Sequence, residues 1–274
     1  MYTNQFITER TYLKGVSPAT IRWYRSSFKA FDGALDSKQQ IVARIAELRR
    51  TNSALSINTY LRCINAYFRW LHEEHTVALI KIPRLKEEQK VLATLNPDQV
   101  HRLLAFKPKG TNLTRAHTLA MILLDSGLRF GEALGLRWEN IDLENLLITV
   151  TGKGGKHRVV PMSLEARKIL FRWRQQNVSE LLFPTRSGIQ ATQRNVGRDF
   201  GLLGKRVGIT GVRFSPHTFR HTFAVSYLRA GGNVLYLQRI LGHSSLEMTN
   251  HYVQSLGTAD LQAVHDRLSM LTRR

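Results

Sequence analysis

The C-terminal two thirds of the chain contain side chains that suit attack on a phosphodiester. They are Arg129, the pair His217 and Arg220, His243, and Tyr252. Arginines can hold the non-bridging oxygens of a phosphate as negative charge accumulates, imidazoles can transfer protons, and a tyrosine can be the nucleophile. These residue types together predict phosphoryl transfer through a tyrosine.

The tyrosine needs help to act as a nucleophile. A phenol with a pKa of about 10 is protonated at neutral pH, so Tyr252 requires a proton acceptor or a strongly cationic site. His243 stands nine positions earlier, across a turn and a short helix, where both side chains can face one pocket. The alternative is that Tyr252 is an ordinary core tyrosine and His243 a residue at a helix end.

The leaving oxygen of a phosphodiester also needs a proton, because an alkoxide is a poor leaving group. Lys153 lies in the glycine-rich segment Thr-Gly-Lys-Gly-Gly-Lys, which we predict to be a hairpin tip. A lysine there can reach into a groove and act as the general acid, with Lys156 as the fallback. The alternative for both is a solvated turn lysine.

The cationic residues have spacings that suit one anion site. His217 and Arg220 are three apart near a predicted helix start, so they share a face. Glu132, three residues after Arg129, can orient its guanidinium as a supporting ion pair, or the pair is simply a helix-end contact. His217 and His221 are four apart, but without an intervening Glu or Cys ligands we predict no metal and no cofactor.

The composition indicates a polyanionic partner. The 274 residues contain 40 Lys and Arg against 20 Asp and Glu, a net charge of +20. Nucleic acid is the leading partner, since no apolar run approaches the roughly 20 residues that span a bilayer and no secretory signal opens the chain. We therefore predict a cytoplasmic protein with no membrane association. The sequence contains a single cysteine, Cys63, so no internal disulfide can form. We expect Cys63 to be a buried thiol on a helix.

The hydrophobic pattern predicts a mainly α protein with a small β component. Residues 1–83 show helical spacing only and predict an all-helical domain, in which Ser17 caps a helix that starts at Pro18. Residues 84–95 are charged and aperiodic, which is typical of a linker. Residues 96–274 form the second domain, which opens at an Asn96–Gln99 capping box. In it, residues 146–150 and 157–162 predict a strand pair, and Ser244 with Glu247 predicts a further capping box before Tyr252.

In order and spacing, these motifs resemble the tyrosine recombinase family, also called phage integrases, and its two-domain members of the Xer type in particular. The matching segments are Gly127-Leu-Arg129 with Glu132-Ala-Leu, the Lys153 hairpin ending at Arg158-Val-Val160-Pro161, the His217-Thr-Phe-Arg220-His221 box, Leu241-Gly-His243, and Tyr252. The resemblance implies a helical core-binding (SAM-like) domain, residues 1–83, and a mixed α/β catalytic domain, residues 96–274 with a C-terminal helix.

The resemblance also implies a mechanism. Tyr252 would attack the scissile phosphate of double-stranded DNA to form a 3′-phosphotyrosyl bond, with Arg129 and Arg220 holding the phosphate. Lys153 would protonate the leaving oxygen, and His217 and His243 would complete the acid and base set. Four chains, expected to be monomers in solution, would bring two DNA sites together as a homotetramer, without ATP or metal. A type IB topoisomerase and a non-catalytic DNA-binding protein are the alternatives.

The segment after the tyrosine gives a further hypothesis. Leu261, Val264, Leu268 and Leu271 recur on one face of a predicted helix. In the resembled family such tails can dock on a neighbouring protomer. The alternative is that the helix packs on its own domain.

Overall fold

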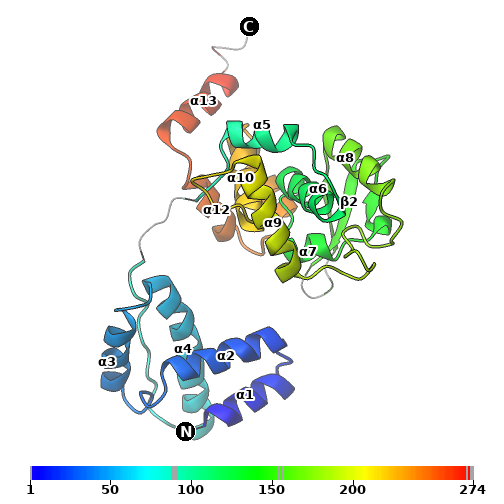
Figure 1. Ribbon diagram of the computed structural model, residues 1–274. Coiled ribbons are helices and arrows are strands. Elements are labelled where there is room, and N and C mark those ends of the chain that lie inside the picture. Colours follow the sequence, from blue (N-terminus) through cyan, green and yellow to red (C-terminus); the bar gives the residue numbers. More distant parts are fainter. Residues whose placement is uncertain (1, 88–91, 153–154, 156, 270, 272–274) are drawn as a thin grey trace. The chain divides into compact units, whose positions relative to one another are not determined.

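The computed structural model describes residues 2–87, 92–152, 155, 157–269 and 271. It divides into two compact units, Met1–Lys90 and Val91–Arg274, and this boundary falls within the predicted linker. The first unit is helical, and the second is helical with one small antiparallel sheet (Figure 1). The prediction of a mainly α protein with a small β component is confirmed.

Four helices form the N-terminal unit. They are α1 (Thr3–Tyr12), α2 (Pro18–Ala30), α3 (Lys38–Leu48) and α4 (Ala54–His75). Three of them begin at a serine whose hydroxyl accepts a backbone N–H three residues later: Ser17, Ser37 and Ser53. The predicted start at Ser17 is confirmed. Helix α1 has no side-chain cap and buries only Phe6, so it gave no periodic signal.

Aromatic rings fill the core of this bundle. Phe6 is fully buried, and its ring lies 5.2–5.9 Å from the rings of Tyr24, Phe28, Tyr67 and Trp70. These tilted and edge-on contacts join α1, α2 and α4. Cys63 on α4 is completely buried, which raises the pKa of its thiol to about 12 and confirms the predicted buried thiol on a helix.

The chain leaves the bundle along α4. Asn65 exchanges two hydrogen bonds with the backbone of Ile82, and Asn58 does the same with Leu85. On the other unit, the backbone N–H of Leu95 donates to the buried hydroxyl of Thr222. The described ends of the predicted linker, residues 84–95, are therefore each fastened to one unit by side chains that bind backbone groups.

The C-terminal unit contains most of the secondary structure. Its helices are α5 (Pro97–Ala105), α6 (Thr111–Ser126), α7 (Phe130–Leu134), η1 (Trp138–Asn140), α8 (Leu164–Arg174), α9 (Gln193–Val207), α10 (Pro216–Arg229), α11 (Val234–Leu241), α12 (Glu247–Val253) and α13 (Thr258–Leu268). The Asn96–Gln99 capping box that starts α5 is confirmed. Among the helices of the described residues, none is both long and apolar enough to cross a membrane.

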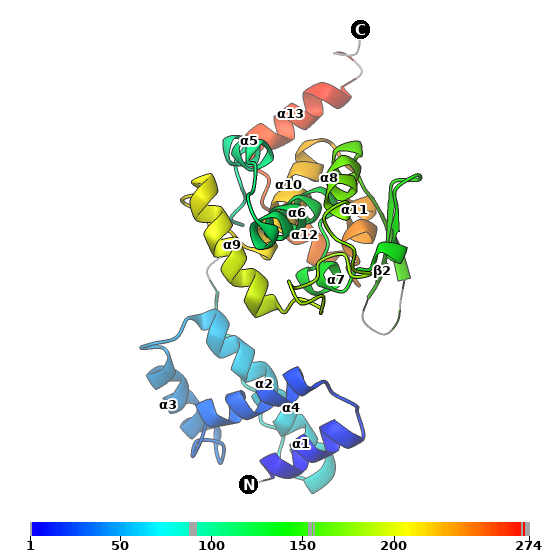
Figure 2. The ribbon, with the colours of Figure 1, turned by 45° about the vertical axis from the view of Figure 1, so that its right-hand side comes forward.

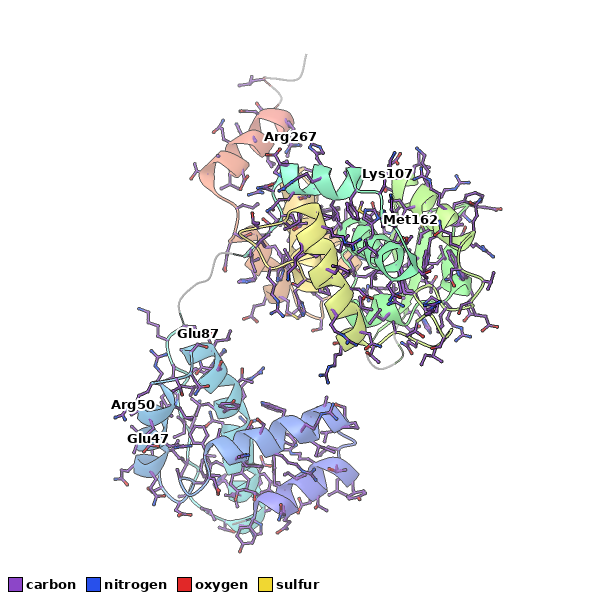
Figure 3. All side chains as sticks on the ribbon, viewed as in Figure 1. Glu47, Arg50, Glu87, Lys107, Met162 and Arg267 are labelled. Atoms are coloured by element: carbon purple, nitrogen blue, oxygen red, sulfur yellow. The ribbon has the colours of Figure 1, made fainter. Side chains whose placement is uncertain are left out.

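Helix α6 is the centre of this unit. It is buried almost all round and packs against α8, α9 and α10, while α10, α11 and α12 pack against one another (Figure 2). Figure 3 shows the side chains that fill the spaces between these helices. A helix covered on all sides is rigid, so α6 gives a fixed frame for the loop that follows it at Gly127.

Three antiparallel strands flank the helices in the order β1-β2-β3. They are β1 (Ile141–Asp142), β2 (Leu147–Thr151) and β3 (His157–Pro161). In the β2–β3 register Ile148 faces Val160 and Val150 faces Arg158. The predicted hairpin is confirmed, whereas the two-residue β1 gave no sequence signal. Lys153 and Lys156, at the predicted tip, lie outside the described residues.

One predicted helix start is wrong. Helix α12 begins at Glu247 after Leu246 and has no side-chain cap, so Ser244 and Glu247 form no capping box. An N-cap side chain must stand directly before the first helical residue, and Ser244 lies three positions from it. Its hydroxyl donates to the sulfur of Met248 instead. Tyr252 nevertheless lies on a short helix after His243, as predicted.

Candidate active site

A buried carboxylate joins two arginines from different elements. In the first turn of α7, Glu132 accepts the backbone N–H and Nη1 of Arg129, both at 2.9 Å. Arg158 on β3 donates Nη1 and Nη2 to the same carboxylate at 2.9 and 2.7 Å. Burial alone would raise the pKa of Glu132, but the hydrogen bonds from Arg158 and Arg129 outweigh it and lower the pKa to about 2. Glu132 is therefore ionised and orients both guanidinium groups.

The end of α11 is the second anchor. Three consecutive carbonyl groups there each accept a hydrogen bond from an arginine: Ile240 from Arg158 at 3.0 Å, Leu241 from Arg220 at 2.9 Å, and Gly242 from Arg129 at 2.7 Å. The last carbonyls of a helix have no partner within the helix and carry partial negative charge. They fix the three side chains without placing a carboxylate beside Arg220.

Arg220 projects from the first turns of α10 into the protein. Only 6% of its surface is exposed. Its Nη2 atom binds Leu241, and its Nη1 atom donates to the carbonyl of Gly127 at the end of α6. Burial lowers the pKa of Arg220 to about 10, so the group stays charged at neutral pH. In contrast, the side chain of Arg129 is 41% exposed and can meet a ligand from solvent.

Two glycines make these close approaches possible. Gly242 ends α11 with φ of +62°, and a Cβ there would lie 2.9 Å from the guanidinium carbon of Arg158. Gly127 ends α6 with φ of +63°, and its Cβ would lie 2.3 Å from the ring of Phe223. Any side chain at either position would combine backbone strain with a clash.

His243, the residue after Gly242, uses both of its ring nitrogens in hydrogen bonds. Nε2 lies 2.9 Å from Nη2 of Arg220, and Nδ1 lies 2.9 Å from the hydroxyl of Thr249. Since a guanidinium only donates, Nε2 is the acceptor and the ring proton lies on Nδ1. Burial and the nearby charges of Arg220, Arg129 and Arg158 lower the pKa of His243 to about 4. His243 is thus neutral and bound to Arg220.

Tyr252 lies in the same pocket. It is 4% exposed, and its ring is parallel to that of His243, with centroids 6.1 Å apart. Its hydroxyl lies 3.2 Å from Nδ1 of His221. Burial raises the pKa of Tyr252, whereas the charges of Arg220 and Arg129 act in the opposite direction. The phenol is therefore protonated at neutral pH and sits in a field that favours its anion.

Of the other predicted residues, His217 lies near this group of side chains, whereas the two lysines lie outside the described residues. His217 stands one turn before His221 on α10, with ring centroids 6.4 Å apart. Lys153 and its fallback Lys156 are not among the described residues, so their proposed role stays a prediction. Within the described ranges, no three His, Cys, Asp or Glu side chains gather as metal ligands would.

Two residues of the pocket were not predicted as site residues. Arg158 stood out in the sequence only as part of the hairpin motif. Its bidentate contact with Glu132 depends on how β3 packs near α7, and local sequence does not show this packing. In the sequence, His221 stood out as the last residue of the His217–His221 box and as a possible metal ligand with His217, but not as a site residue. The signal that could have found it is its position four residues after His217, which puts both imidazoles on one face of α10.

The assembled groups suit chemistry on an anionic phosphate. Two charged guanidinium groups, those of Arg129 and Arg220, act on a protonated phenol, and a neutral imidazole lies at its hydroxyl. Fixed donors of this kind stabilise charge that develops on phosphoryl oxygens, and they are already in place before a ligand arrives.

Glu132→Gln is expected to destabilise the protein by about 3 kcal/mol at pH 7. The folded pKa of about 2 lies below the ordinary value of 4.5, so the ionised carboxylate stabilises the fold fully above pH 4.5. This contribution is lost as the pH falls towards 2. Chemical denaturation followed by circular dichroism at pH 7 and pH 3 should show a difference between variant and parent that shrinks in acid.

Glu180→Gln is the matched control. Glu180 also pairs with an arginine, Arg137, but its side chain is 82% exposed, and an exposed pair contributes little. Equal losses for the two variants, or a Glu132→Gln loss that does not depend on pH, would contradict the proposed anchor.

Known proteins are similar to this chain over most of its length. The model of the phage integrase family matches residues 93–258. Tyrosine recombinase XerC of Xanthomonas campestris pv. campestris (strain B100) is 32% identical over 254 residues, covering 90% of this chain and 78% of the relative. Tyrosine recombinase XerD of Shewanella oneidensis is 29% identical, covering 96% and 94%. The Tn1549 transposon integrase, solved with transposon right end DNA, superposes with a TM-score of 0.79 at 21% identity, covering 98% of this chain and all of that one.

The chain therefore belongs to the phage integrase family. Within that family it is a tyrosine site-specific recombinase, an enzyme that acts on DNA.

Proposed function

We propose that this recombinase cleaves and rejoins double-stranded DNA through a 3′-phosphotyrosyl bond formed by Tyr252. The observation that carries the proposal is the hydroxyl of Tyr252, buried in a pocket that also holds Arg220 and Arg129. A buried, neutral phenol does not need fixed cations beside it for stability. A phosphate that is gaining negative charge does need them.

The other residues take roles that their contacts support. Arg129 and Arg220 hold the scissile phosphate, and Glu132 orients Arg129. His243 holds Arg220 through its Nε2 atom, and His217 lies at the pocket edge where it can contact the phosphate. Lys153 lies outside the described residues, and it takes the role that the family resemblance implies, which is to protonate the leaving 5′-oxygen. Since the phosphotyrosyl bond conserves the phosphodiester energy, the 5′-hydroxyl of a partner strand can reseal it without a nucleotide or metal.

Covalent trapping tests this function. A duplex selected for binding from a randomised library, nicked just past the cleavage position, loses the short strand on cleavage and cannot reseal. The protein should then form a stable adduct, and peptide mapping should place the DNA on Tyr252. Exchange between two plasmids that carry the site separates recombination from relaxation by a topoisomerase. No adduct with a tightly bound duplex would favour a non-catalytic DNA-binding protein.

We further propose that four protomers assemble two DNA sites, and that the enzyme acts in the cytoplasm, where its DNA substrate lies. The support for assembly is α13. None of its residues is buried, and Leu261 and Leu268 are 55% and 53% exposed. Two polar contacts join α13 to Arg229 of its own unit. Asp260 forms an ion pair with the Arg229 side chain, and Arg267, labelled in Figure 3, donates a hydrogen bond to the Arg229 carbonyl. The apolar side of α13 is thus free to dock on a neighbouring protomer.

Replacing both Leu261 and Leu268 by glutamine is expected to reduce cooperative binding to a two-site duplex about tenfold while leaving binding to a single half-site unchanged. The two side chains supply apolar area that a partner would bury, at about 1 kcal/mol or more for each. Gel-shift titrations on the two duplexes measure this. Leu164→Gln, at an exposed leucine of α8, is the control. Unchanged cooperativity would show that α13 packs elsewhere.

A further inference from the structure

His221 is the imidazole that faces the nucleophile. Its Nδ1 atom lies 3.2 Å from the hydroxyl oxygen of Tyr252, and the ring centroids are 5.7 Å apart. The contact joins α10 to α12, two helices that pack together. At this distance a proton can pass between the two atoms directly.

The other two histidines of the pocket are less well placed for that proton. His243 stacks against the ring of Tyr252, but its Nε2 accepts from Arg220 and its Nδ1 proton is donated to Thr249. It has no free acceptor for the phenol. His217 lies one turn before His221 on α10, with its ring 6.4 Å from that of His221.

The surroundings keep the His221 ring neutral in the free protein. Burial, together with the neighbouring charges of His217, Arg220 and His251, lowers its pKa to about 4. A neutral imidazole has one nitrogen free to accept. The hydroxyl of Tyr252 can therefore donate to Nδ1 while the positive charge of Arg220 favours the phenolate.

We propose that His221 is the general base of the cleavage reaction, and that its Nδ1 atom takes the proton of the Tyr252 hydroxyl as the phenol attacks DNA. The inference rests on the proposed role of Tyr252 as nucleophile. In this step the O–H bond of Tyr252 breaks, its proton moves to Nδ1, and its oxygen bonds to phosphorus. The bond from phosphorus to the 5′-oxygen breaks, and that oxygen takes a proton from the general acid. On resealing, the His221 imidazolium returns its proton to Tyr252.

Bound DNA makes this transfer more favourable. The free pocket is strongly cationic, and like charges oppose a second proton on His221. A scissile phosphate held by Arg129 and Arg220 brings negative charge that offsets them. The imidazolium is therefore stabilised when substrate is present, and the phenol of the free enzyme stays protonated and unreactive.

His221→Asn and His221→Ala test the assignment. An asparagine oxygen can occupy the position of Nδ1 and accept a hydrogen bond, but an amide does not take up a proton near neutral pH. We expect both variants to slow single-turnover cleavage of the nicked duplex about a hundredfold or more. His101→Asn is the matched control, since it removes an exposed imidazole on α5, away from these residues, and should cleave at the parent rate.

Near-parent cleavage by His221→Asn with slow cleavage by His221→Ala would show that a hydrogen bond is sufficient, and would overturn the proposal. So would parent rates for both. Gel-shift affinity and thermal unfolding verify that each variant folds and binds. If His221→Ala fails either check, His221→Asn alone decides.

A modified duplex separates the two sides of the reaction. With sulfur in place of the bridging 5′-oxygen, the leaving group is a thiolate that needs no proton. The slow cleavage of His221→Asn should persist on this substrate, and recovery would place His221 on the leaving-group side and overturn the proposal. If the DNA of the parent adduct maps to a residue other than Tyr252, the proposed function itself fails. If it maps to Tyr252 while His221→Asn cleaves normally, only the His221 assignment fails.

Discussion

Replacing Tyr252 by phenylalanine is expected to abolish the covalent adduct with nicked DNA while leaving DNA affinity unchanged. Phenylalanine keeps the ring that stacks on His243 and fills the same buried space. It removes only the hydroxyl at His221, a hydrogen bond that contributes about 1 kcal/mol to stability. Denaturing gels of the trapping reaction measure the adduct, and gel shifts measure affinity.

Tyr236→Phe is the control for this variant, because Tyr236 is 60% exposed on α11 and should form the adduct at the parent level. An adduct with Tyr252→Phe as abundant as that of the parent would mean that another side chain carries the DNA.

Arg220→Lys is expected to slow cleavage about a hundredfold or more, although it keeps the positive charge. The guanidinium binds three groups at once: the carbonyls of Gly127 and Leu241, and Nε2 of His243. A lysine ammonium lacks the planar fork and cannot keep this geometry. Loss of one preorganised donor to a developing oxyanion typically costs a factor of 10² to 10³.

Single-turnover cleavage at saturating protein measures this loss, because saturation removes any effect on DNA affinity. Arg137→Lys, at an exposed arginine of the same unit, keeps charge in the same way and should be neutral. A rate for Arg220→Lys within about threefold of the parent would contradict the role of the guanidinium geometry.

Local signals in the sequence predicted much of the fold. Serine and asparagine caps, and glycines with positive φ at Gly127 and Gly242, mark element ends through contacts within a few residues. Elements without such signals were missed: α1 buries a single residue, and β1 is two residues long. The capping box at Ser244 failed because the same short motif can occur without a helix at the required position.

The pocket was less predictable than the fold. Residue types and spacing identified Arg129, Arg220, His243 and Tyr252, which the structure brings together. Their mutual contacts depend on backbone carbonyls at the end of α11, which have no signature in the sequence. The partners of Arg158 and His221 could not be predicted either. Arg158 binds Glu132 and His221 contacts Tyr252, and each pair joins two elements whose packing the sequence does not reveal.

The carbonyl anchors at the end of α11 also set the charge balance of the pocket. Because they are neutral, they orient Arg220 without cancelling its charge, and Glu132 is the carboxylate shared by Arg129 and Arg158. These three arginines and one glutamate leave two uncompensated positive charges. A DNA phosphodiester arrives with one negative charge and acquires a second as the fifth bond to phosphorus forms. The net charge of these four side chains is therefore equal and opposite to that of the pentacoordinate species, and it exceeds the charge of the intact phosphodiester by one.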